Sequence, residues 1–300
     1  MTDSLLTNTS AMTALLALNQ TQQSLATYEN QVSTGKSVAT AADNAAYWSI
    51  ATTMSSQVGS LNAVSASLSE SSSLLSTMSA ALNSVVSVMN GLQQNLTTAL
   101  SYASEGSTSD LANVQSMISE QQQQLISIGG SSVFNGVNFL DTTGGNVQLL
   151  ASYNQLTGAS YISVNTSSTQ LFETAATTAT QGVLGAKGTN YTSASILTLS
   201  VTSATAGDIS NMLKDVQSAI TSLTTAASTL GADQNNVTSQ QNFISNLTDS
   251  LTAGVGSLVD ADMNEASTKI SALQVQQQLG VQALAIANSN TQMILKLFGL

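Results

Sequence analysis

A long seven-residue repeat of apolar residues is the feature of this chain that most restricts its fold. Steps of alternately three and four residues lead from Leu61 to Ala99, and every position on the way except Ser71 is apolar. On a helix this spacing places the apolar side chains in one seam, which a partner helix has to cover. The sequence therefore predicts a long helix that pairs as in a coiled coil.

Three other stretches carry a related helical period. Repeats run from Ile209 to Leu258 and from Val259 to Phe298, and a weaker repeat runs from Ala11 to Val32. We therefore predict a mainly α-helical protein in which long antiparallel helices, similar to a coiled coil, come from both ends of the chain.

Each end of the chain also contains a predicted helix break. Gly35 follows the N-terminal repeat, as a glycine at a helix C-terminus does, and Asp43 or Asn44 can cap the next helix. Near the other end, the register of the repeat slips by one residue shortly after Gly254 and Gly256. We interpret this slip as a joint between two helical units.

The middle of the chain, residues 129–208, is rich in Gly, Ser and Thr and follows a different pattern. Residues 146–150 and 161–164 alternate like strands and flank a turn-rich segment, which predicts a small β-hairpin. Residues 196–201 also alternate like a strand. The rest of the stretch 166–205 has little periodicity, so we expect a small surface insert there.

The residue types that are absent exclude several classes of function. The chain has no His, Cys or Arg, and its formal net charge is −11. Nucleic acid and anionic membrane surfaces are not expected partners, because both are bound by clustered basic residues. Hydrolase triads, thiol nucleophiles and the HExxH zinc motif cannot be built without His and Cys. We therefore predict no enzymatic activity, no metal and no cofactor.

Targeting signals are also not predicted. The first residues, MTDSLLTNTS, lack the basic region and the continuous apolar region of a cleavable signal peptide. The chain contains no run of about 18 consecutive apolar residues, so the sequence does not predict a membrane-spanning helix.

Two short motifs look like ligand sites but lack residues that such sites require. Gly35-Lys36-Ser37 is similar to the end of a phosphate-binding loop, but Asn30 stands where that loop needs glycine. Residues 260–264, DADMN, begin like a calcium loop, but Glu265 replaces its glycine and Ser271 its final glutamate. We interpret the first motif as a helix end and the second as a solvated helix start.

Three motifs, in the correct order, resemble bacterial flagellins. Residues 32–54, VSTGKSVATAADNAAYWSIATTM, are similar to the segment where the terminal domain of flagellins passes into the next domain, in its alphaproteobacterial form. Residues 132–140, SVFNGVNFL, resemble the motif that precedes the flagellin hairpin. Residues 258–298 resemble the C-terminal flagellin helix and the segment that leads into it.

This resemblance implies a non-enzymatic structural subunit that polymerises into the extracellular flagellar filament for motility. Residues 1–42 with 258–300 would form the terminal helical domain in the filament core. Residues 43–165 with 206–257 would form a helical domain with the hairpin, and residues 166–205 a variable surface insert. The implied partners are other copies of the chain, hook-associated and cap proteins, an export chaperone and the export apparatus, with export that leaves no cleaved signal peptide.

The resemblance also assigns roles to residues. Packing in the filament core is expected from Leu18, Leu25, Val259, Met263, Ile270, Leu273, Leu284, Ile294 and Phe298. The joint between domains is expected at Gly35, Asp43, Tyr47, Trp48, Gly254 and Gly256. The adjacent aromatic residues Tyr47 and Trp48 would supply a large apolar surface, either as ordinary core packing or as a contact with another subunit.

Two departures from the family pattern affect these expectations. Flagellins usually have a basic residue where this chain has Ser37, so subunit contacts should depend less on salt bridges. In flagellins that a vertebrate Toll-like receptor senses, two arginines follow an ALN-like stretch. Here Gly91 and Gln93 take their places after Ala81-Leu82-Asn83, which implies a poor agonist.

Alternatives remain at the level of sequence. Hook–filament junction proteins resemble flagellins at both ends, and only copy number in the flagellum would separate the two. An adhesin displayed by residues 166–205 is a rival from another class, although a plain or glycan-bearing surface loop fits this short Ser/Thr-rich segment better.

Overall fold

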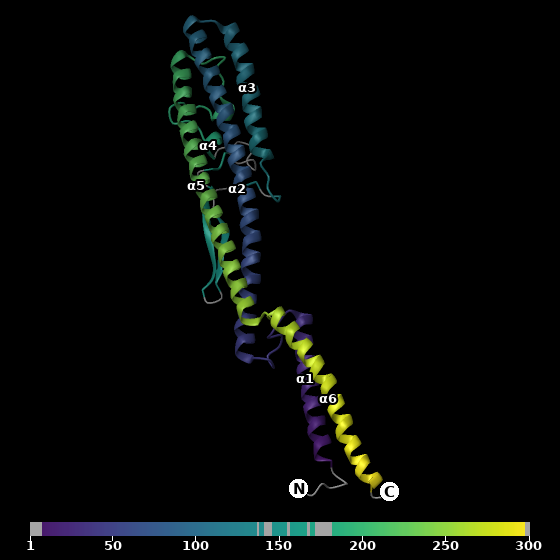
Figure 1. Cartoon of the computed structure of the whole chain (residues 1–300). Helices are drawn as coiled ribbons and strands as arrows, with labels where there is room; N and C mark the ends of the chain where they lie inside the picture. The colour runs from purple at the N-terminus through teal and green to yellow at the C-terminus, as the bar shows by residue number, and fades with distance from the viewer. Residues whose placement is uncertain are drawn as a thin grey trace. The chain divides into compact units, whose positions relative to one another are not determined.

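The computed structural model describes residues 8–136, 138–140, 146–154, 157–166, 169–171 and 182–297. In these residues the chain is mainly helical, with long helices toward both ends and a two-stranded antiparallel sheet in the middle (Figure 1). The elements are α1 (Thr9–Thr34), α2 (Ala45–Glu105), α3 (Thr108–Ser131), β1 (Asn146–Asn154), β2 (Gly158–Asn165), α4 (Gly182–Gly185), the 3-10 helix η2 (Ile196–Thr198), α5 (Ala206–Val259) and α6 (Met263–Leu297). The predicted fold class is confirmed.

The chain divides into two compact units, and each is described by itself. The first unit comprises residues 1–58 and 249–300, and the second comprises residues 59–248. The first unit therefore contains α1, α6, the first turns of α2 and the last turns of α5. The functional domain boundaries that we expect from the family resemblance stay a prediction.

In the first unit, α1 and α6 lie side by side (Figure 1). The Asn8 side chain begins α1 by accepting a hydrogen bond from the Ala11 N–H at 3.0 Å, and its amide donates to the Ala287 carbonyl of α6 at 2.9 Å. Gly35 ends α1 with a φ of 71°, in the left-handed region that glycine adopts without strain. The predicted helix end at Gly35 is confirmed.

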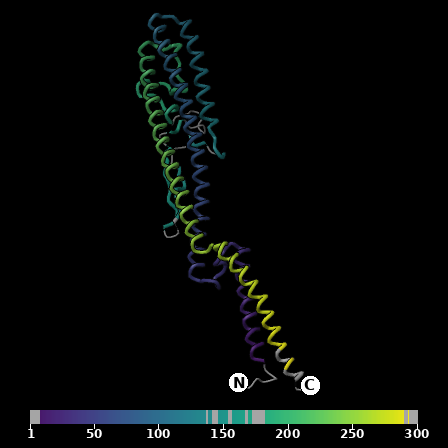
Figure 2. The backbone as a smooth tube through the Cα atoms, in the orientation of Figure 1, coloured from purple at the N-terminus to yellow at the C-terminus, as the bar shows by residue number. Residues whose placement is uncertain are grey.

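In the second unit, α2, α3 and α5 run alongside one another (Figure 2). The seam of α2 is buried as its repeat predicts: Leu61, Val64, Leu68, Leu75, Met78, Leu82, Val85, Met89, Leu92, Leu96 and Ala99 are at most 5% exposed. The Gln93 side chain joins α2 to Gln217 of α5 at 2.7 Å, and Asn95 joins it to Gln121 of α3 at 2.9 Å. The paired long helix expected from the repeat is therefore present.

The apolar character of α2 has a second reading. By length and composition alone, α2 is long and apolar enough to cross a membrane. The criterion of a continuous apolar run did not indicate this, because polar residues are interspersed along α2. Burial of its seam within the second unit accounts for the same apolar residues without a bilayer.

The hairpin in the second unit is longer than the sequence predicts. β1 and β2 pair antiparallel with Val147 opposite Val164 and Leu149 opposite Ile162, and the register shifts between Leu150 and Ser152. Leu149 and Val164 are at most 6% exposed, so one face of the hairpin is buried. The predicted hairpin is confirmed.

The strand predicted at residues 196–201 is wrong, because this segment begins with the short helix η2. Glutamine side chains of α3 bind its backbone where a neighbouring strand would. Gln122 donates to the Ile196 carbonyl at 3.0 Å, and Gln115 accepts from the Val201 N–H at 2.7 Å. The alternation of residue types therefore reflects burial of one side of the segment rather than membership of a sheet.

Candidate assembly surface

The terminal helix pair exposes large apolar side chains on both of its helices. On α1, Met12 is 64% exposed, Leu15 49% and Leu16 69%. On α6, Val275, Leu279, Val281, Ile286 and Met293 are between 53% and 64% exposed. Helix α1 contains no buried residue at all. Large apolar residues gathered at an exposed surface mark interaction sites, so this outer surface is the candidate site.

The inner side of the pair holds most of the residues predicted for the filament core. Leu18, Leu25, Ile270, Leu273 and Leu284 are half-buried and follow the predicted repeats. A Cβ added at Gly280 would lie 3.3 Å from Leu18 Cδ1, so α1 and α6 approach closely there. These residues hold the two helices together within one subunit, and their packing in a filament stays a prediction.

The other residues predicted for the filament core have different surroundings. Val259 is 5% exposed at the end of α5, and Met263 is 44% exposed at the start of α6. Ile294 lies within α6, but its side chain is outside the described residues, as is the whole of Phe298.

The loop after α1 and the break between α5 and α6 are bound to each other within the first unit. Lys36 and Asp260 pair through their backbones in an isolated antiparallel β-bridge. The Ser37 N–H donates to the Val259 carbonyl at 2.7 Å, and the Ala261 N–H donates to the Gly35 carbonyl at 2.9 Å. A small apolar cluster supports this pairing: Val38, Ala51 and Val259 are buried, and Val255 and Leu258 pack against them. These two segments of the first unit are therefore held together by backbone hydrogen bonds and a small apolar core, and their role as a joint between domains stays a prediction.

The cap of α2 is Asn44 rather than Asp43. The Asn44 side-chain oxygen Oδ1 accepts from the N–H groups of Ala46 at 3.1 Å and Tyr47 at 3.2 Å. Asp43 instead closes the preceding loop, where it accepts from the Thr40 N–H at 2.8 Å. The hydrogen bonds from Thr40 hold the pKa of Asp43 below its ordinary value. Of the two caps that the sequence allowed, the structure therefore selects Asn44.

Gly254 and Gly256 do not break a helix, in contrast to the simplest expectation for a joint. Helix α5 continues through both to Val259, and α6 begins at Met263. A Cβ added at Gly254 would lie 2.7 Å from Met54 Cε, so this glycine allows α2 and α5 to pack closely. The chain direction instead changes at residues 260–262, a few residues beyond the glycines.

The second half of this break is the predicted helix start. The Asp262 carboxylate accepts from the N–H groups of Asn264 at 2.9 Å and Glu265 at 3.1 Å, which is how an aspartate caps a helix. The interpretation of residues 260–264 as a solvated helix start is therefore confirmed.

The aromatic pair at the start of α2 points away from the core. Tyr47 is 48% exposed and Trp48 is 39% exposed, whereas Ala51 is the buried residue of this part of the helix. Ordinary core packing is thus not the role of these side chains in the single chain. A contact with another subunit remains as the alternative.

The receptor-segment positions lie in the second unit, within α2 and next to other helices. Gln93 donates to Gln217 of α5 at 2.7 Å. A Cβ added at Gly91 would lie 2.7 Å from Gln121 Nε2 of α3. Gly91 therefore makes room for a glutamine of the neighbouring helix, an arrangement that sequence spacing alone did not indicate.

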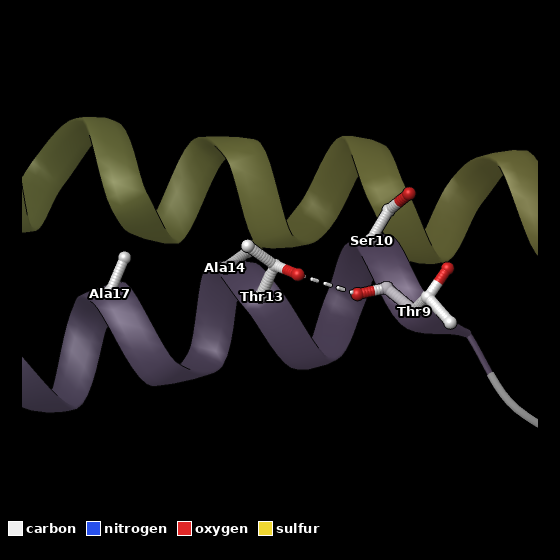
Figure 3. A pocket seen from close by; sticks show the side chains of 5 residues that line it. All are labelled: Thr9, Ser10, Thr13, Ala14 and Ala17. Atoms are coloured by element: carbon white, nitrogen blue, oxygen red, sulfur yellow. Dashed lines mark hydrogen bonds between the residues drawn. The ribbon is translucent and has the colours of Figure 1, made fainter.

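The chemistry available at the terminal helices suits packing. Figure 3 shows an open hollow on α1 that is lined by Thr9, Ser10, Thr13, Ala14 and Ala17, with the Thr13 hydroxyl donating to the Thr9 carbonyl at 2.9 Å. All five side chains are small and uncharged. Among the described residues there is also no group of three or more His, Cys, Asp or Glu residues that could hold a metal ion.

The sequence reasoning missed the outer surface of the terminal pair. It followed residues on the repeat, whereas Met12, Leu15 and Leu16 lie off the repeat on the other side of α1. A signal was available, because large apolar residues outside an already complete seam are unusual on a helix whose other face is solvated.

A protein with one unit built around a full core and another whose paired terminal helices leave apolar residues uncovered has the features of a self-assembling subunit. Two family models agree: the bacterial flagellin N-terminal helical region matches residues 5–144, and the C-terminal helical region matches residues 213–298. The chain belongs to the bacterial flagellin family.

Individual relatives match over almost their whole length. The chain is 38% identical to a flagellin of Brucella melitensis biotype 1 over 98% of this chain and 99% of the relative. It is 35% identical to flagellin C of Rhizobium meliloti, over 98% and 99% respectively, and 31% identical to flagellin FljM of Caulobacter vibrioides, over 99% and 98%. These sources support the predicted resemblance to alphaproteobacterial flagellins.

Membership of this family identifies the chain as a structural subunit that polymerises into the flagellar filament for motility. The alternative of a hook–filament junction protein is not favoured, because the relatives described above are flagellins along nearly their full length.

Proposed function

We propose that the outer apolar surface of α1 and α6 makes the contacts between neighbouring subunits in the core of the filament. The observation that carries this proposal is the set of apolar residues on both helices that the described residues leave between 49% and 69% exposed. In this arrangement the inner seam, with Leu18 against Gly280, keeps α1 and α6 together, and the outer surface joins one subunit to the next. Residues 1–42 with 258–300 would then act as the filament core.

The size of the apolar effect sets how many side chains assembly has to bury. Full burial of a large aliphatic side chain contributes about 1.5–3 kcal/mol. Leu16, Ile286 and Met293 are each more than 60% exposed, so most of this contribution is still available to them. Because association costs about 4–15 kcal/mol, each subunit that joins the filament has to bury several such side chains.

We also propose that Tyr47 and Trp48 contact another subunit near the joint. Their exposed rings lie in the same unit as the terminal helices, and the neighbouring cluster of Val38, Ala51 and Val259 fixes the turn of α2 that carries them. Aromatic side chains supply a large contact area at a small entropic cost, and they are enriched at protein interfaces.

The proposal extends to export and to partners outside the filament core. It includes passage through the flagellar export apparatus with an export chaperone, contacts with hook-associated and cap proteins, and no cleavage of a signal peptide. Family membership supports each of these points. We propose no catalytic role, because the chain has no His or Cys. The intact mass of subunits taken from filaments tests the expected export without cleavage.

Substitution of one outer residue on each helix tests the assembly surface. The variant Leu16→Gln with Ile286→Gln removes apolar contact area while keeping side chains of similar size and good helix propensity. We expect no filaments in electron micrographs under conditions in which the unmodified chain polymerises. Thermal unfolding of the second unit should be unchanged, because neither residue belongs to it.

A matched control comes from the second unit. Met117 on α3 is 51% exposed, so Met117→Gln removes a similar apolar surface elsewhere in the chain. Filaments should form normally from this variant. Normal filaments from the Leu16 and Ile286 double variant would contradict the proposed surface.

A further inference from the structure

Within the second unit, a loop of the insert encloses the carboxylate of Asp215. Asp215 lies on α5 and is 7% exposed. Its oxygens accept from the Tyr191 N–H at 2.7 Å, the Asn190 N–H at 3.0 Å and the Asn190 side-chain amide at 2.7 Å, with the Thr189 hydroxyl at 3.3 Å. One side chain of α5 therefore binds three successive residues of the loop.

The backbone of this loop is shaped to admit the carboxylate. A Cβ added at Gly188 would collide with the Asp215 carboxylate and would lie 2.9 Å from the Tyr191 carbonyl. The base of the loop is closed by the Lys187–Ser195 bridge and by the Gly188 N–H, which donates to the Ala194 carbonyl at 3.3 Å. The loop is thus a closed structure that fits around a single acidic group.

The following segment is attached by a different chemistry. Gln122 of α3 donates to the carbonyl groups of Ile196 at 3.0 Å and Leu199 at 3.1 Å, and Gln115 accepts from the Val201 N–H at 2.7 Å. These amide side chains do not titrate. The segment therefore has one attachment that depends on a charge and another that does not.

The segment covers apolar residues of its own and of its neighbours. Leu184, Ile196, Leu199 and Val201 are between 0% and 5% exposed. Release of the segment from the helices would bring part of this surface into contact with water, which is unfavourable for apolar side chains. A dye that binds apolar surface should therefore detect release of residues 196–201, but not a change confined to residues 189–191.

Few charged groups surround Asp215. On the loop, Lys187 is exposed and Tyr191 contributes its backbone N–H to the carboxylate. On α5, Lys214 donates to Asn211 at 3.3 Å, and Asp208 accepts from Thr205 at the start of the helix. The side chains of α3 that bind residues 196–201 are the neutral residues Gln115 and Gln122. The side chains of α2 that reach α5 and α3, Gln93 and Asn95, are also neutral. The partners that hold Asp215 are thus uncharged hydrogen-bond donors.

The hydrogen bonds set the direction of the pH dependence. Burial raises the pKa of Asp215, but the donors outweigh burial, led by the Tyr191 N–H and the Asn190 side chain, so that the pKa lies below its ordinary value of 3.8. A lowered pKa in the folded chain means that the charged form stabilises the structure above a pH of 3.8. This stabilisation is lost as the pH falls through the depressed pKa.

We propose that residues 187–201 form a strap with two attachments, and that protonation of Asp215 opens the first, at residues 189–191, while the glutamine attachment at residues 196–201 stays closed. A protonated carboxyl group presents its own O–H toward donors that need an acceptor. The remaining carbonyl oxygen is a neutral and weaker acceptor, so the hydrogen bonds from Thr189, Asn190 and Tyr191 weaken together and the strap is held mainly at its other end.

Amide hydrogen exchange on the full-length monomer at neutral pH tests the charge-dependent attachment. In Asp215→Asn, exchange at Asn190 and Tyr191 should become about tenfold faster or more, as expected for the loss of charge-assisted hydrogen bonds. Exchange at Val201 should be unchanged. In Gln115→Ala the pattern should reverse, with faster exchange at Val201 alone.

Two further variants control for simple damage to the fold. Asp208→Asn removes another carboxylate of α5, which binds Thr205 rather than the strap, and should leave Asn190 and Tyr191 protected. Gly188→Ala attacks the same attachment from the strap side, because its Cβ would collide with Asp215. Gly188→Ala should reproduce the exchange pattern of Asp215→Asn, and it takes the place of Asp215→Asn in the test if Asp215→Asn folds poorly.

A pH titration of the unmodified chain completes the test. The amide chemical shifts of Asn190 and Tyr191 should change with a common midpoint below pH 3.8, the ordinary pKa of the group, while binding of an apolar dye should stay constant. The same titration of Asp215→Asn should lack this midpoint. Unchanged exchange in Asp215→Asn, or loss of Val201 protection at the same midpoint, would overturn the proposal.

Discussion

The two units of this flagellin use the same kind of helical repeat with different results. In the second unit the repeat of α2 is covered by neighbouring helices, and Leu68, Leu82 and Leu96 are fully buried. In the first unit the repeat of α1 faces one helix, α6, and no residue of α1 is buried. A repeat therefore predicts a helix and its contacting face, whereas the number of neighbours decides whether a core forms.

This difference separates stability from assembly. A unit with its own core is stable as a single chain, whereas a two-helix pair with half-buried contacts gains most of its stability from further contacts. Among its described residues the first unit does contain a small core, at Val38, Ala51 and Val259, and this lies where the loop after α1 meets the end of α5 rather than along α1 and α6. The terminal helices are therefore the part that should respond most strongly to polymerisation.

The largest expected effect comes from shortening the C-terminus. Removal of residues 294–300 takes away the end of α6 together with Ile294 and Phe298, which the family resemblance places in the filament core. We expect filament growth to be abolished, as judged by electron microscopy, while circular dichroism still detects a folded second unit. Normal filaments from the shortened chain would refute the assignment of this end to the filament core.

Hydrogen exchange on the monomer tests the comparison directly. Isolated helices with weak apolar faces are marginal in water, so residues 1 to 40 and 260 to 300 should exchange rapidly before assembly. Amides around Leu82 and Leu96 of α2 should exchange far more slowly, because that part of the helix lies in a core. Strong protection of the last forty residues in the monomer would contradict the expected folding upon assembly.

The sequence predicted α2, α5 and α6 from long repeats that contain a few polar residues, and it missed the shorter helix α3, whose repeat contains Gln122. Helix α3 was not predicted, although Leu111, Val114, Ile118 and Leu125 are buried along it. Gln122 occupies a buried place in the same series because it binds the backbone of residues 196–201. A polar residue with a distant partner therefore hides an apolar face from a search for periodicity.

Other features depended on contacts that sequence spacing does not contain. The strand expected at residues 196–201 was wrong because the hydrogen-bond partners of this segment are glutamine side chains rather than a strand. The helix break near the C-terminus lies at residues 260–262 and not at the glycines before it. Gly254 instead lies inside α5, where it lets the Met54 side chain of α2 approach closely. Gly35, in contrast, was predicted correctly, since its left-handed conformation is a local property of a helix end.

A pair of leucine substitutions of moderate effect sharpens the distinction between the units. Leu92→Ala empties a fully buried place in the second unit and should destabilise the monomer by about 2–5 kcal/mol in denaturant unfolding. Leu16→Ala changes a side chain that is 69% exposed and should leave monomer stability nearly unchanged. Filament assembly should respond in the opposite order at temperatures where both monomers are folded. A large loss of monomer stability in Leu16→Ala would remove the distinction between the units.

The smallest expected effect on the fold concerns Gly91 and Gln93, the two positions at which the resemblance to receptor-sensed flagellins implies arginine. We predict that this chain is a poor agonist of the vertebrate Toll-like receptor even as a monomer, because loss of one partner of a buried charge pair at an interface costs about 2–5 kcal/mol. Neither Gly91 nor Gln93 carries such a charge. A titration on reporter cells measures this, and activation equal to that of an arginine-bearing flagellin would contradict it.

The double variant Gly91→Arg with Gln93→Arg is the companion experiment, and the structure indicates its cost. Gln93 would lose its bond to Gln217, and a side chain at Gly91 would displace Gln121, whose Nε2 lies 2.7 Å from the added Cβ. Replacement of a helical glycine adds about 1 kcal/mol of helix stability, which offsets these losses, so the net change in the free energy of unfolding should be small. Signalling should rise in this variant and stay at background when arginine is placed instead at the exposed positions Gln94 and Thr98. Equal signalling from both pairs would mean that added positive charge, rather than its position on α2, is what the receptor detects.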